Sequence, residues 1–197
     1  MSKRKKKFII VFAGITSLIV LLLGIILFDY LEKDSDKNHR EDFNLYFYAP
    51  NYEFNILEDP EYIELNRVIS YKFGAVTKTV LPENYSAIDP LLPFISSLLD
   101  TMIAGNYDAY ANFFSTNFKK ENELPKKFTM QRIYNVTIEK ISDPDTEHGY
   151  LYMIDFMISK NDGTLRNDVE SDASKPWYVS IITENGEYKI DKIVTVN

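Results

Sequence analysis

Three hydrophobic patterns follow one another along the chain. Residues 8–28 are an unbroken apolar run without a charge, residues 91–103 repeat apolar positions every three or four residues, and residues beyond 130 alternate apolar and polar positions. At about 1.5 Å per residue, a helix over 8–28 crosses a hydrocarbon core of about 30 Å. The patterns therefore predict a transmembrane helix, then an amphipathic helix, then β-strands.

The flanks of the apolar run differ in charge. Residues 3–7 are all basic, whereas Asp29, Glu32 and Asp34 follow the run among mixed charges. By the positive-inside rule, we expect residues 1–7 to be a cytoplasmic tail and the chain after the helix to be extracytoplasmic. The run is longer than the apolar region of a cleaved signal peptide and lacks a cleavage site of small residues. We therefore expect a single-pass protein of the cell membrane that keeps its anchor in the lipid bilayer.

Two segments separate the predicted membrane helix from the patterned region. Residues 29–42 are charged and unpatterned, which is typical of a juxtamembrane linker. Residues 43–86 are predicted to be an extended lead-in with one or two short strands, because 44–49 and 68–81 are rich in β-branched and aromatic residues. An amphipathic helix over 62–71 is an alternative for part of this lead-in.

A pair of helices is predicted next. Asp89 followed by Pro90 has the form of an N-cap with proline in the first helical turn, and Gly105 stands where this helix would end. A second, short helix follows, with Asn106 or Asp108 as its cap. The side chains of this second segment that are expected to turn inward are Tyr110, Phe113 and Phe114.

After a polar loop at 117–127, the hydrophobic period changes to two. The runs predicted to be strands are residues 131–141, 150–159, 177–183 and 188–196. Asn185 and Gly186 join the last two runs, and Asn-Gly is a preferred sequence for a two-residue hairpin turn. Residues 87–197 are therefore predicted to form an α+β domain, in which a helical hairpin packs on a curved antiparallel sheet of about four strands.

Composition and charge narrow the chemistry. The 197 residues contain no cysteine and two histidines, which excludes disulfides, thiolate metal sites and cysteine nucleophiles. Five of the 22 basic residues lie before residue 8, so 17 remain beyond it against 29 acidic residues. An acidic body lacks the positive surface that a phosphate backbone requires, so no direct nucleic-acid binding is expected.

The C-terminal sequence carries a recurring family pattern. Its characteristic positions are Trp177, Val179, Ile181, the turn residues Asn185 and Gly186, and then Tyr188, Lys189, Ile190 and Ile193. Together with the helix–helix–strand order, and with residues 104–114 as a corner between helices, these positions resemble the NTF2-like superfamily. The resemblance implies a cone-shaped sheet that encloses helices over about 87–197.

A short basic tail, one membrane span and an external NTF2-like domain resemble the layout of VirB8-like proteins of type IV secretion and of TcpC-like conjugation proteins of Gram-positive bacteria. In those families the domain is an assembly part without catalytic residues. The resemblance therefore implies a non-enzymatic component of a conjugative-transfer machine, with other membrane proteins and further copies of itself as partners. Cell-wall and sporulation factors of the same layout are an alternative.

Asp155 is the acidic residue within the most apolar strand run. It is expected either to face solvent or to face a cavity beside Tyr134 and Tyr152, where burial would raise its pKa. His148 lies in a polar turn and is expected to be solvated, as is His39 in the linker. No catalytic residue, cofactor or metal site is predicted. The acidic loop 161–175 offers oxygen ligands, but its spacing differs from that of an EF-hand, so we expect a solvated loop.

The lead-in contains a cluster of aromatic residues, namely Tyr46, Phe47, Tyr48, Tyr52 and Phe54. These side chains either pack the lead-in onto the sheet or form a strip that docks a partner. Two functional hypotheses result, an assembly component and a surface-tethered module that binds a small ligand. Packed side chains between helices and sheet would favour assembly, and an open cavity there would favour ligand binding.

Overall fold

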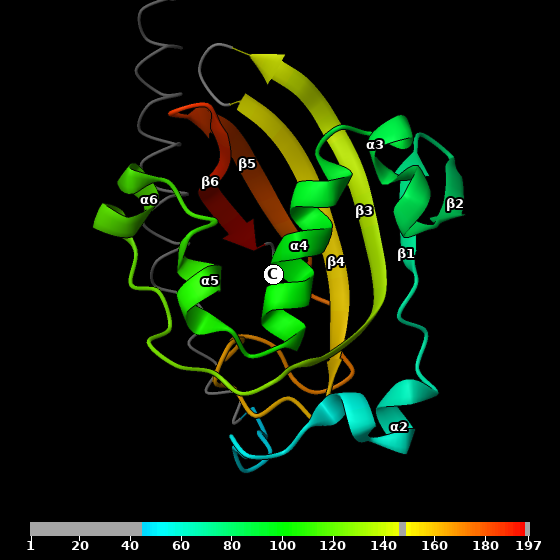
Figure 1. Cartoon of the computed structure of the whole chain (residues 1–197), viewed down its shortest axis with the longest axis vertical. Helices are drawn as coiled ribbons and strands as arrows, with labels where there is room; N and C mark the ends of the chain where they lie inside the picture. Colours follow the sequence, from blue (N-terminus) through cyan, green and yellow to red (C-terminus); the bar gives the residue numbers. More distant parts are fainter. Residues whose placement is uncertain (1–44, 146–148, 196–197) are drawn as a thin grey trace, which may run out of the picture. The chain divides into compact units, whose positions relative to one another are not determined.

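A six-stranded mixed sheet is the central element of the computed structural model, which describes residues 45–145 and 149–195 (Figure 1). Its strand order is β2-β1-β3-β4-β5-β6. The predicted tail, membrane helix and linker lie outside the described residues, as do His39 and His148. Within the described ranges, no helix combines the length and hydropathy needed to cross a bilayer.

Four strands occupy the runs with a period of two. They are β3 (Arg132–Asp145), β4 (Gly149–Ser159), β5 (Trp177–Glu184) and β6 (Glu187–Thr195), and each is antiparallel to the next. Asn185 and Gly186 connect β5 to β6 with φ values of 53° and 83°, because a type I′ turn needs positive φ at both positions. The predicted α+β class and the four C-terminal strands are confirmed.

The sheet is larger than predicted because part of the lead-in joins it. β1 (Ile69–Phe73) and β2 (Val76–Val80) form a hairpin in which Gly74 has a φ of 57°. β1 then pairs in parallel with β3. The expected antiparallel sheet of about four strands is therefore corrected to a mixed sheet of six. The sequence pattern identified the strand content of 68–81 but carried no information on which strand it would pair with.

Other parts of the lead-in also differ from expectation. Residues 45–49 contain no strand, although their composition favoured one. The amide of Tyr48 donates to the carbonyl of Asn161, which lies in a loop, so the backbone of this segment does not pair with a strand there. The chain continues through a 3-10 turn, η1 (Ile56–Glu58), and one helical turn, α2 (Pro60–Ile63), whose N-cap is Asp59. A helix over 62–71 is wrong, since β1 already begins within that range.

The predicted helical pair is present. α4 (Leu92–Ile103) is followed by Gly105, which has a φ of 63°. α5 (Tyr107–Ala111) begins at its N-cap Asn106, whose side chain accepts a hydrogen bond from the amide of Ala109 at 3.0 Å. The residues of α4 that are buried against the sheet are Leu92, Ile95, Leu98, Leu99 and Met102.

Three further short helices complete the described chain. η2 (Pro82–Asn84) and α3 (Tyr85–Ile88) precede α4, and α6 (Thr116–Glu121) follows α5. α6 occupies part of the predicted polar loop at 117–127, so that prediction is corrected. Ser115 caps α6, and Phe118 is its one buried side chain. A single apolar residue in one and a half turns gives no helical period, which is why the pattern did not reveal it.

The helices and one face of the sheet share a single hydrophobic core. α4 and α5 lie over the same face of the bent strands (Figure 1). The residues of β4 that point into this core are Tyr152, Ile154, Phe156 and Ile158. The rings of Phe156 and Trp177 meet edge to face, with centroids 5.1 Å apart, which links β4 to β5 through the core.

Candidate functional site

The three residues of the predicted cavity are not brought together. Tyr152 points into the core, whereas Asp155 lies three residues along β4 on the opposite face and accepts a hydrogen bond from the Ser174 hydroxyl at 2.7 Å. Tyr134 also lies away from the core and donates to Asp172 at 2.9 Å. A strict period of two over 131–141 would place Tyr134 on the same side as Val136 and Ile138, and the structure places it on the other side.

A β-bulge explains the displacement of Tyr134. Asn135 has a φ of 50°, and the register of β3 against β4 shifts between Tyr134 and Thr137. One extra residue in the strand reverses the alternation, so Ile133 and Val136 face the core and Tyr134 faces outward. The alternation of inward and outward side chains along β3 is therefore interrupted next to Tyr134, the residue that the cavity hypothesis placed beside Asp155.

The carboxylate inside the core is Asp89 instead. We define the Asp89 cluster as Asp89, Tyr71 and Tyr152, which come from the α3–α4 junction, β1 and β4. The Tyr152 hydroxyl lies 2.8 and 2.9 Å from the two carboxylate oxygens, and the Tyr71 hydroxyl donates to Oδ2 at 2.8 Å. The amide of Leu91 donates to Oδ1 at 2.8 Å. Sequence reasoning interpreted Asp89 only as a helix cap, and nothing local to it indicated the two tyrosines.

Both carboxylate oxygens of the Asp89 cluster have internal partners. Asp89 is 3% exposed, and three donors reach it: the hydroxyl of Tyr71, the amide of Leu91, and the hydroxyl of Tyr152, whose single hydrogen is shared between the two oxygens. Burial, followed by the hydrogen bond to Asp89, raises the pKa of Tyr152 above its ordinary value of 10.0. The cluster therefore ties the helices to the sheet through a carboxylate that internal donors already engage.

The aromatic residues of the lead-in lie along the loop between β4 and β5. The amide of Tyr48 donates to the carbonyl of Asn161 at 2.9 Å, and Phe47 packs over Gly163, where an added Cβ would lie 3.0 Å from the ring. Phe47 is half-buried, whereas the other four predicted interface residues remain 41–69% exposed. Their rings therefore anchor the lead-in and also leave an aromatic surface open to solvent.

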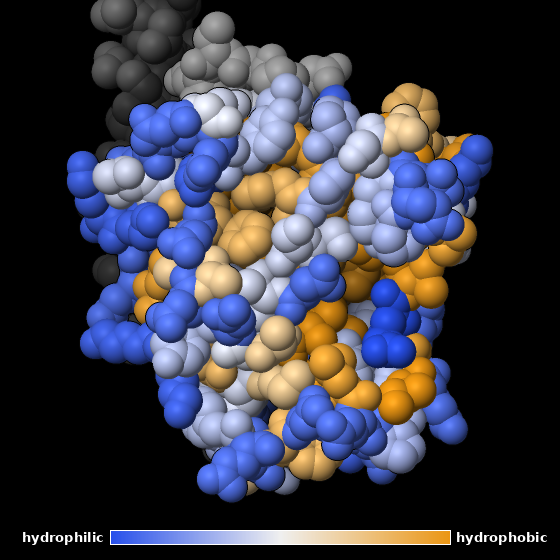
Figure 2. Space-filling view, viewed as in Figure 1, coloured by the Kyte–Doolittle hydropathy of each residue, from blue (hydrophilic) through white to orange (hydrophobic). Residues whose placement is uncertain are grey.

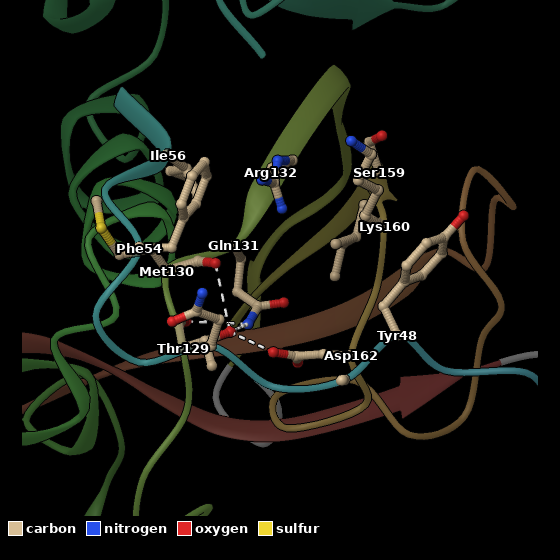
Figure 3. A pocket seen from close by; sticks show the side chains of 13 residues that line it. Tyr48, Phe54, Ile56, Thr129, Met130, Gln131, Arg132, Ser159, Lys160 and Asp162 are labelled. Carbon is tan, nitrogen blue, oxygen red and sulfur yellow. Dashed lines mark hydrogen bonds between the residues drawn. The ribbon is translucent and has the colours of Figure 1, made fainter. Parts of the chain in front are cut away.

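A cavity of about 210 Å³ opens beneath this segment, which we call the lead-in cleft (Figure 3). Phe54 and Ile56 lie on one side of it, and Tyr48 and Lys160 lie on the other. Gln131 projects between them from the segment just before β3. The cleft thus combines residues from the lead-in, from the start of β3 and from the end of β4, which are far apart in the sequence.

Two ion pairs border the lead-in cleft. Nε and Nη2 of Arg132 lie 3.0 and 2.8 Å from one carboxylate oxygen of Asp59, and Cζ of Arg132 lies 5.1 Å from the ring centre of Phe54. The hydrogen bond from Arg132 holds the pKa of Asp59 below its ordinary 3.8. Lys160 pairs with Glu61. Because each cation has a carboxylate beside it, the cleft has no excess positive charge.

A hydrogen-bond network forms the floor of the cleft. The side-chain nitrogen of Gln131, Nε2, lies 2.9 Å from both the backbone carbonyl oxygen and the hydroxyl of Thr129. That hydroxyl donates to Asp162 at 2.5 Å, and Asp162 also accepts from the hydroxyl of Thr164 at 2.7 Å. These bonds fix Gln131 rigidly although it belongs to no helix or strand. Nothing in the sequence pattern had singled out Gln131, Arg132 or Lys160.

The remainder of the acidic loop is held by Arg166. This arginine is 3% exposed, lies 4.9 Å from the ring centre of Trp177, and binds Asp168 at 2.6 Å. Burial raises the pKa of Asp168, but Arg166 and Lys175 lower it by more, so the net shift is downward. Within the described residues, no group of three or more side chains of metal-binding type converges. The loop is thus structured, not simply solvated as expected.

A second pocket, of about 270 Å³, lies between α4 and the strands β1 and β3. Arg67, Tyr85, Ser96 and Asp100 are its polar lining residues. Burial raises the pKa of both Asp100 and Tyr85. A carboxyl group with a raised pKa beside a cleft has the properties of a ligand-binding group, so this pocket is a candidate site for a small ligand.

The β1–β2 hairpin and the end of α3 form an exposed, largely apolar region, which we call the hairpin surface. We define it as Phe73, Val76 and Ile88 together with the charged residue Lys78. Phe73 is 79% and Val76 is 53% exposed, and a groove of about 450 Å³ runs along these side chains. Figure 2 shows hydrophobic residues gathered on this side of the molecule, over β1 and β2. β2 is an edge strand that pairs only with β1 among the described residues.

Comparisons with known proteins give no independent guide to these sites. Searches against models of protein families, against curated proteins and against solved structures each found no match.

Proposed function

We propose that the chain is a non-enzymatic, single-pass membrane protein whose extracytoplasmic domain assembles with other membrane proteins. The observation that carries the proposal is the distribution of apolar side chains. Those between the helices and the sheet pack into one core, whereas Phe73 and Val76 project from the hairpin surface. Large exposed apolar side chains are typical of surfaces that bind other proteins.

An NTF2-like cone is the fold that we propose for this domain. Its support is the succession of two helices and four antiparallel strands, with α4 and α5 on one face of the bent sheet. The apolar run at 8–28 and the basic residues 3–7 support the anchor and its orientation. Combined, these features suit a VirB8-like or TcpC-like component, and a conjugative-transfer or type IV secretion-like machine is the assembly we propose.

The hairpin surface is the region we assign to partner binding. An edge strand presents backbone groups that a strand from another chain can pair with, and side chains at alternate positions then decide which chain binds. On β2 the exposed alternate positions are Val76 and Lys78, while Val80 is buried in the core, so a strand with an apolar residue and an acidic residue two positions apart is complementary. A second copy of β2 paired antiparallel about Lys78 would bring two lysines together, which disfavours self-pairing there.

Photo-crosslinking in living cells tests this assignment. We expect a photoreactive residue at Phe73 of the full chain to form a cross-link to another membrane protein, and the same residue at Lys120, exposed on α6, to form none. Phe73→Glu should abolish the cross-linked partner in co-purification while leaving the membrane level of the chain unchanged. Equal cross-linking from both positions, or from neither, would contradict the assignment.

Two cellular experiments test the wider proposal. Protease added outside cells that lack a wall should remove the chain beyond about residue 30, since a 20-residue helix after a short tail ends there; protection of that region would overturn the orientation. Deletion should impair DNA transfer in a cell that depends on a conjugative machine encoded beside this chain. Unimpaired transfer would remove the conjugation hypothesis and favour a cell-wall role.

The pocket beside Asp100 favours a second candidate function, a surface-tethered module that binds a small ligand. Its lining combines apolar residues with a few polar ones, which is the composition of a ligand site. Thermal stabilisation of the chain by a small molecule, lost in Asp100→Asn and retained in Phe73→Glu, would support this candidate over assembly.

A further inference from the structure

Gln131 has bonding capacity that the fold does not use. It is 2% exposed, and its nitrogen lies within hydrogen-bond distance of the Thr129 carbonyl, the Thr129 hydroxyl and the Thr164 hydroxyl. A carbonyl oxygen can only accept, so the Thr129 carbonyl requires the nitrogen of Gln131 on that side. The oxygen of Gln131 therefore points the other way, toward the lead-in cleft (Figure 3).

No described residue donates a hydrogen bond to this oxygen. Every fully buried side-chain nitrogen and oxygen in the described residues has a partner, so the Gln131 oxygen must be accessible through the cavity. A rigid acceptor that is nearly enclosed and has no internal partner is costly to fold unless water or a ligand satisfies it. The cleft therefore contains one fixed position for an N–H or O–H donor.

Arg132, the next residue along the chain, also lines the cleft and offers a donor. Its Nε and Nη2 bind Asp59, and its guanidinium lies over the ring of Phe54, which leaves Nη1 without a hydrogen-bond partner among the described residues. The ion pairs Arg132–Asp59 and Lys160–Glu61 engage both cations of the cleft, and Asp162 in its floor adds a carboxylate that accepts hydrogen bonds from neutral hydroxyls. This charge distribution disfavours an anionic ligand, so the cleft suits a neutral ligand that both donates and accepts.

The rest of the lining is mixed. Apolar and aromatic side chains lie beside polar or charged ones, namely Asn51, Ser159, Lys160 and Asp162. Ile56 and Ile158 are buried, and the half-exposed rings of Tyr48 and Phe54 stand on opposite sides of the opening. A volume of about 210 Å³ is smaller than a typical pocket for drug-sized molecules, so it suits one compact group of a longer ligand. The group that suits the cleft is neutral, carries both a donor and an acceptor, has a small apolar end, and continues into a ring with an apolar face.

We propose that the lead-in cleft binds an N-acetylated amino-sugar residue of a glycan chain. The acetamido N–H donates to the oxygen of Gln131, and its carbonyl accepts from Arg132. The methyl group contacts Ile56 and Ile158, and the C–H face of the pyranose ring stacks on Tyr48 or Phe54. The inference rests on the extracytoplasmic placement proposed above, where such a domain would meet the N-acetylated glycans of a bacterial cell wall, and it does not depend on the hairpin surface.

Binding of defined oligosaccharides to the full chain tests this proposal. The chain is kept in a detergent without a sugar headgroup, and binding is measured by calorimetric titration and by saturation-transfer NMR. We expect the tetramer of N-acetylglucosamine to bind at least about tenfold more tightly than cellotetraose, which has the same backbone with hydroxyls in place of the acetamido groups. Equal affinity for the two, or binding of neither, would overturn the proposal.

Matched variants locate the binding. Phe54→Ala removes a ring that lines the cleft, whereas Tyr52→Ala removes a similarly exposed ring of the same segment that lies over Lys127. We expect Phe54→Ala to weaken binding at least about fivefold and Tyr52→Ala to change it less than about twofold. Gln131→Leu should abolish the preference for the acetamido sugar. Unchanged affinity in Phe54→Ala would contradict the proposed location even if Gln131→Leu does not fold.

Two further ligands distinguish the source of the acetamido group. Peptide-free glycan strands from bacterial wall, which alternate N-acetylglucosamine and N-acetylmuramic acid, should bind at least as tightly as the N-acetylglucosamine tetramer if wall glycan is the natural ligand. A short alanine peptide carries the same amide and methyl groups without the ring. Tighter binding of that peptide than of either glycan would replace the glycan proposal with peptide recognition.

Discussion

The Asp89 cluster and the lead-in cleft are both nearly buried groups of polar side chains, yet they differ in what is left over. In the Asp89 cluster, three internal donors engage the carboxylate, and each of its oxygens has a partner. In the cleft, Gln131 is equally buried, but its oxygen faces a cavity without an internal donor. Burial and unusual pKa values therefore do not by themselves mark a binding site, whereas unused bonding capacity beside a cavity does.

The largest effect should come from removing the centre of the Asp89 cluster. Asp89→Ala leaves the hydroxyls of Tyr71 and Tyr152 without their acceptor inside the core, so we expect a loss of about 3 kcal/mol or more in the free energy of unfolding. Urea unfolding of the full chain in micelles, followed by the fluorescence of the single tryptophan, Trp177, measures this loss. Asp89→Asn keeps the size and one acceptor, so it should cost less. Near-wild-type stability of Asp89→Ala would mean that the cluster is not structural.

A second variant should disturb the cleft without altering any of its polar groups. Gly105 has a φ of 63°, and an added Cβ would lie 2.9 Å from the amide nitrogen of Met130, beside Thr129. We expect Gly105→Ala to cost about 2 kcal/mol, since a left-handed conformation alone costs 1–2 kcal/mol for a residue with a side chain. Because the backbone beside the cleft must shift, binding of the N-acetylglucosamine tetramer should weaken as well. Lower stability with unchanged glycan affinity would show that the backbone contact between Gly105 and Met130 does not determine the shape of the cleft.

The sequence predicted those parts of the fold that rest on local periodicity. The four C-terminal strands, α4, the Asn185–Gly186 turn and the cap at Asn106 all have signals within a few residues. The pairing of β1 with β3 could not be predicted in this way, because it depends on contacts between residues about 67 positions apart along the chain, such as Ser70 and Thr137. Long-range pairing has no signature in a single sequence.

The site was predicted less well than the fold, for a related reason. Asp155 was singled out because it interrupts an apolar run, and of its two alternatives the outward-facing one holds and the cavity-facing one does not. The bulge at Asn135 placed Tyr134 outward as well. Gln131 has no distinctive local context, because its role arises from the lead-in and the β4–β5 loop meeting over it. The aromatic group of the lead-in was the one useful signal, since Tyr48 and Phe54 do line the cleft.

A matched pair of tyrosines should give a smaller and more selective effect. Tyr152→Phe removes a buried donor to Asp89 and is expected to cost about 1 kcal/mol, whereas Tyr134→Phe removes an exposed bond to Asp172 and should change stability by less than about 0.5 kcal/mol. The same urea titration compares them. A larger loss in Tyr134→Phe than in Tyr152→Phe would reverse the assignment of the inner and outer faces of the sheet.

The smallest effects near neutral pH, and the clearest separation of the two regions, should appear on changing pH. The pKa of Asp59 is lowered by Arg132, so the ion pair at the cleft is intact above about pH 4 and is lost as pH falls through the lowered pKa. The pKa of Tyr152 is raised by burial, so its neutral form stabilises the fold below about pH 10, and this stability declines as pH rises further and the unfolded tyrosine ionises. Glycan binding should therefore be constant between about pH 5 and 8 and fall only in acid, while the urea midpoint should fall in alkali.

Asp59→Asn should remove the acid limb of the binding curve and leave the alkaline limb of the stability curve unchanged. A binding midpoint near pH 6.5, the ordinary range of histidine, would instead implicate a group outside the cleft described above.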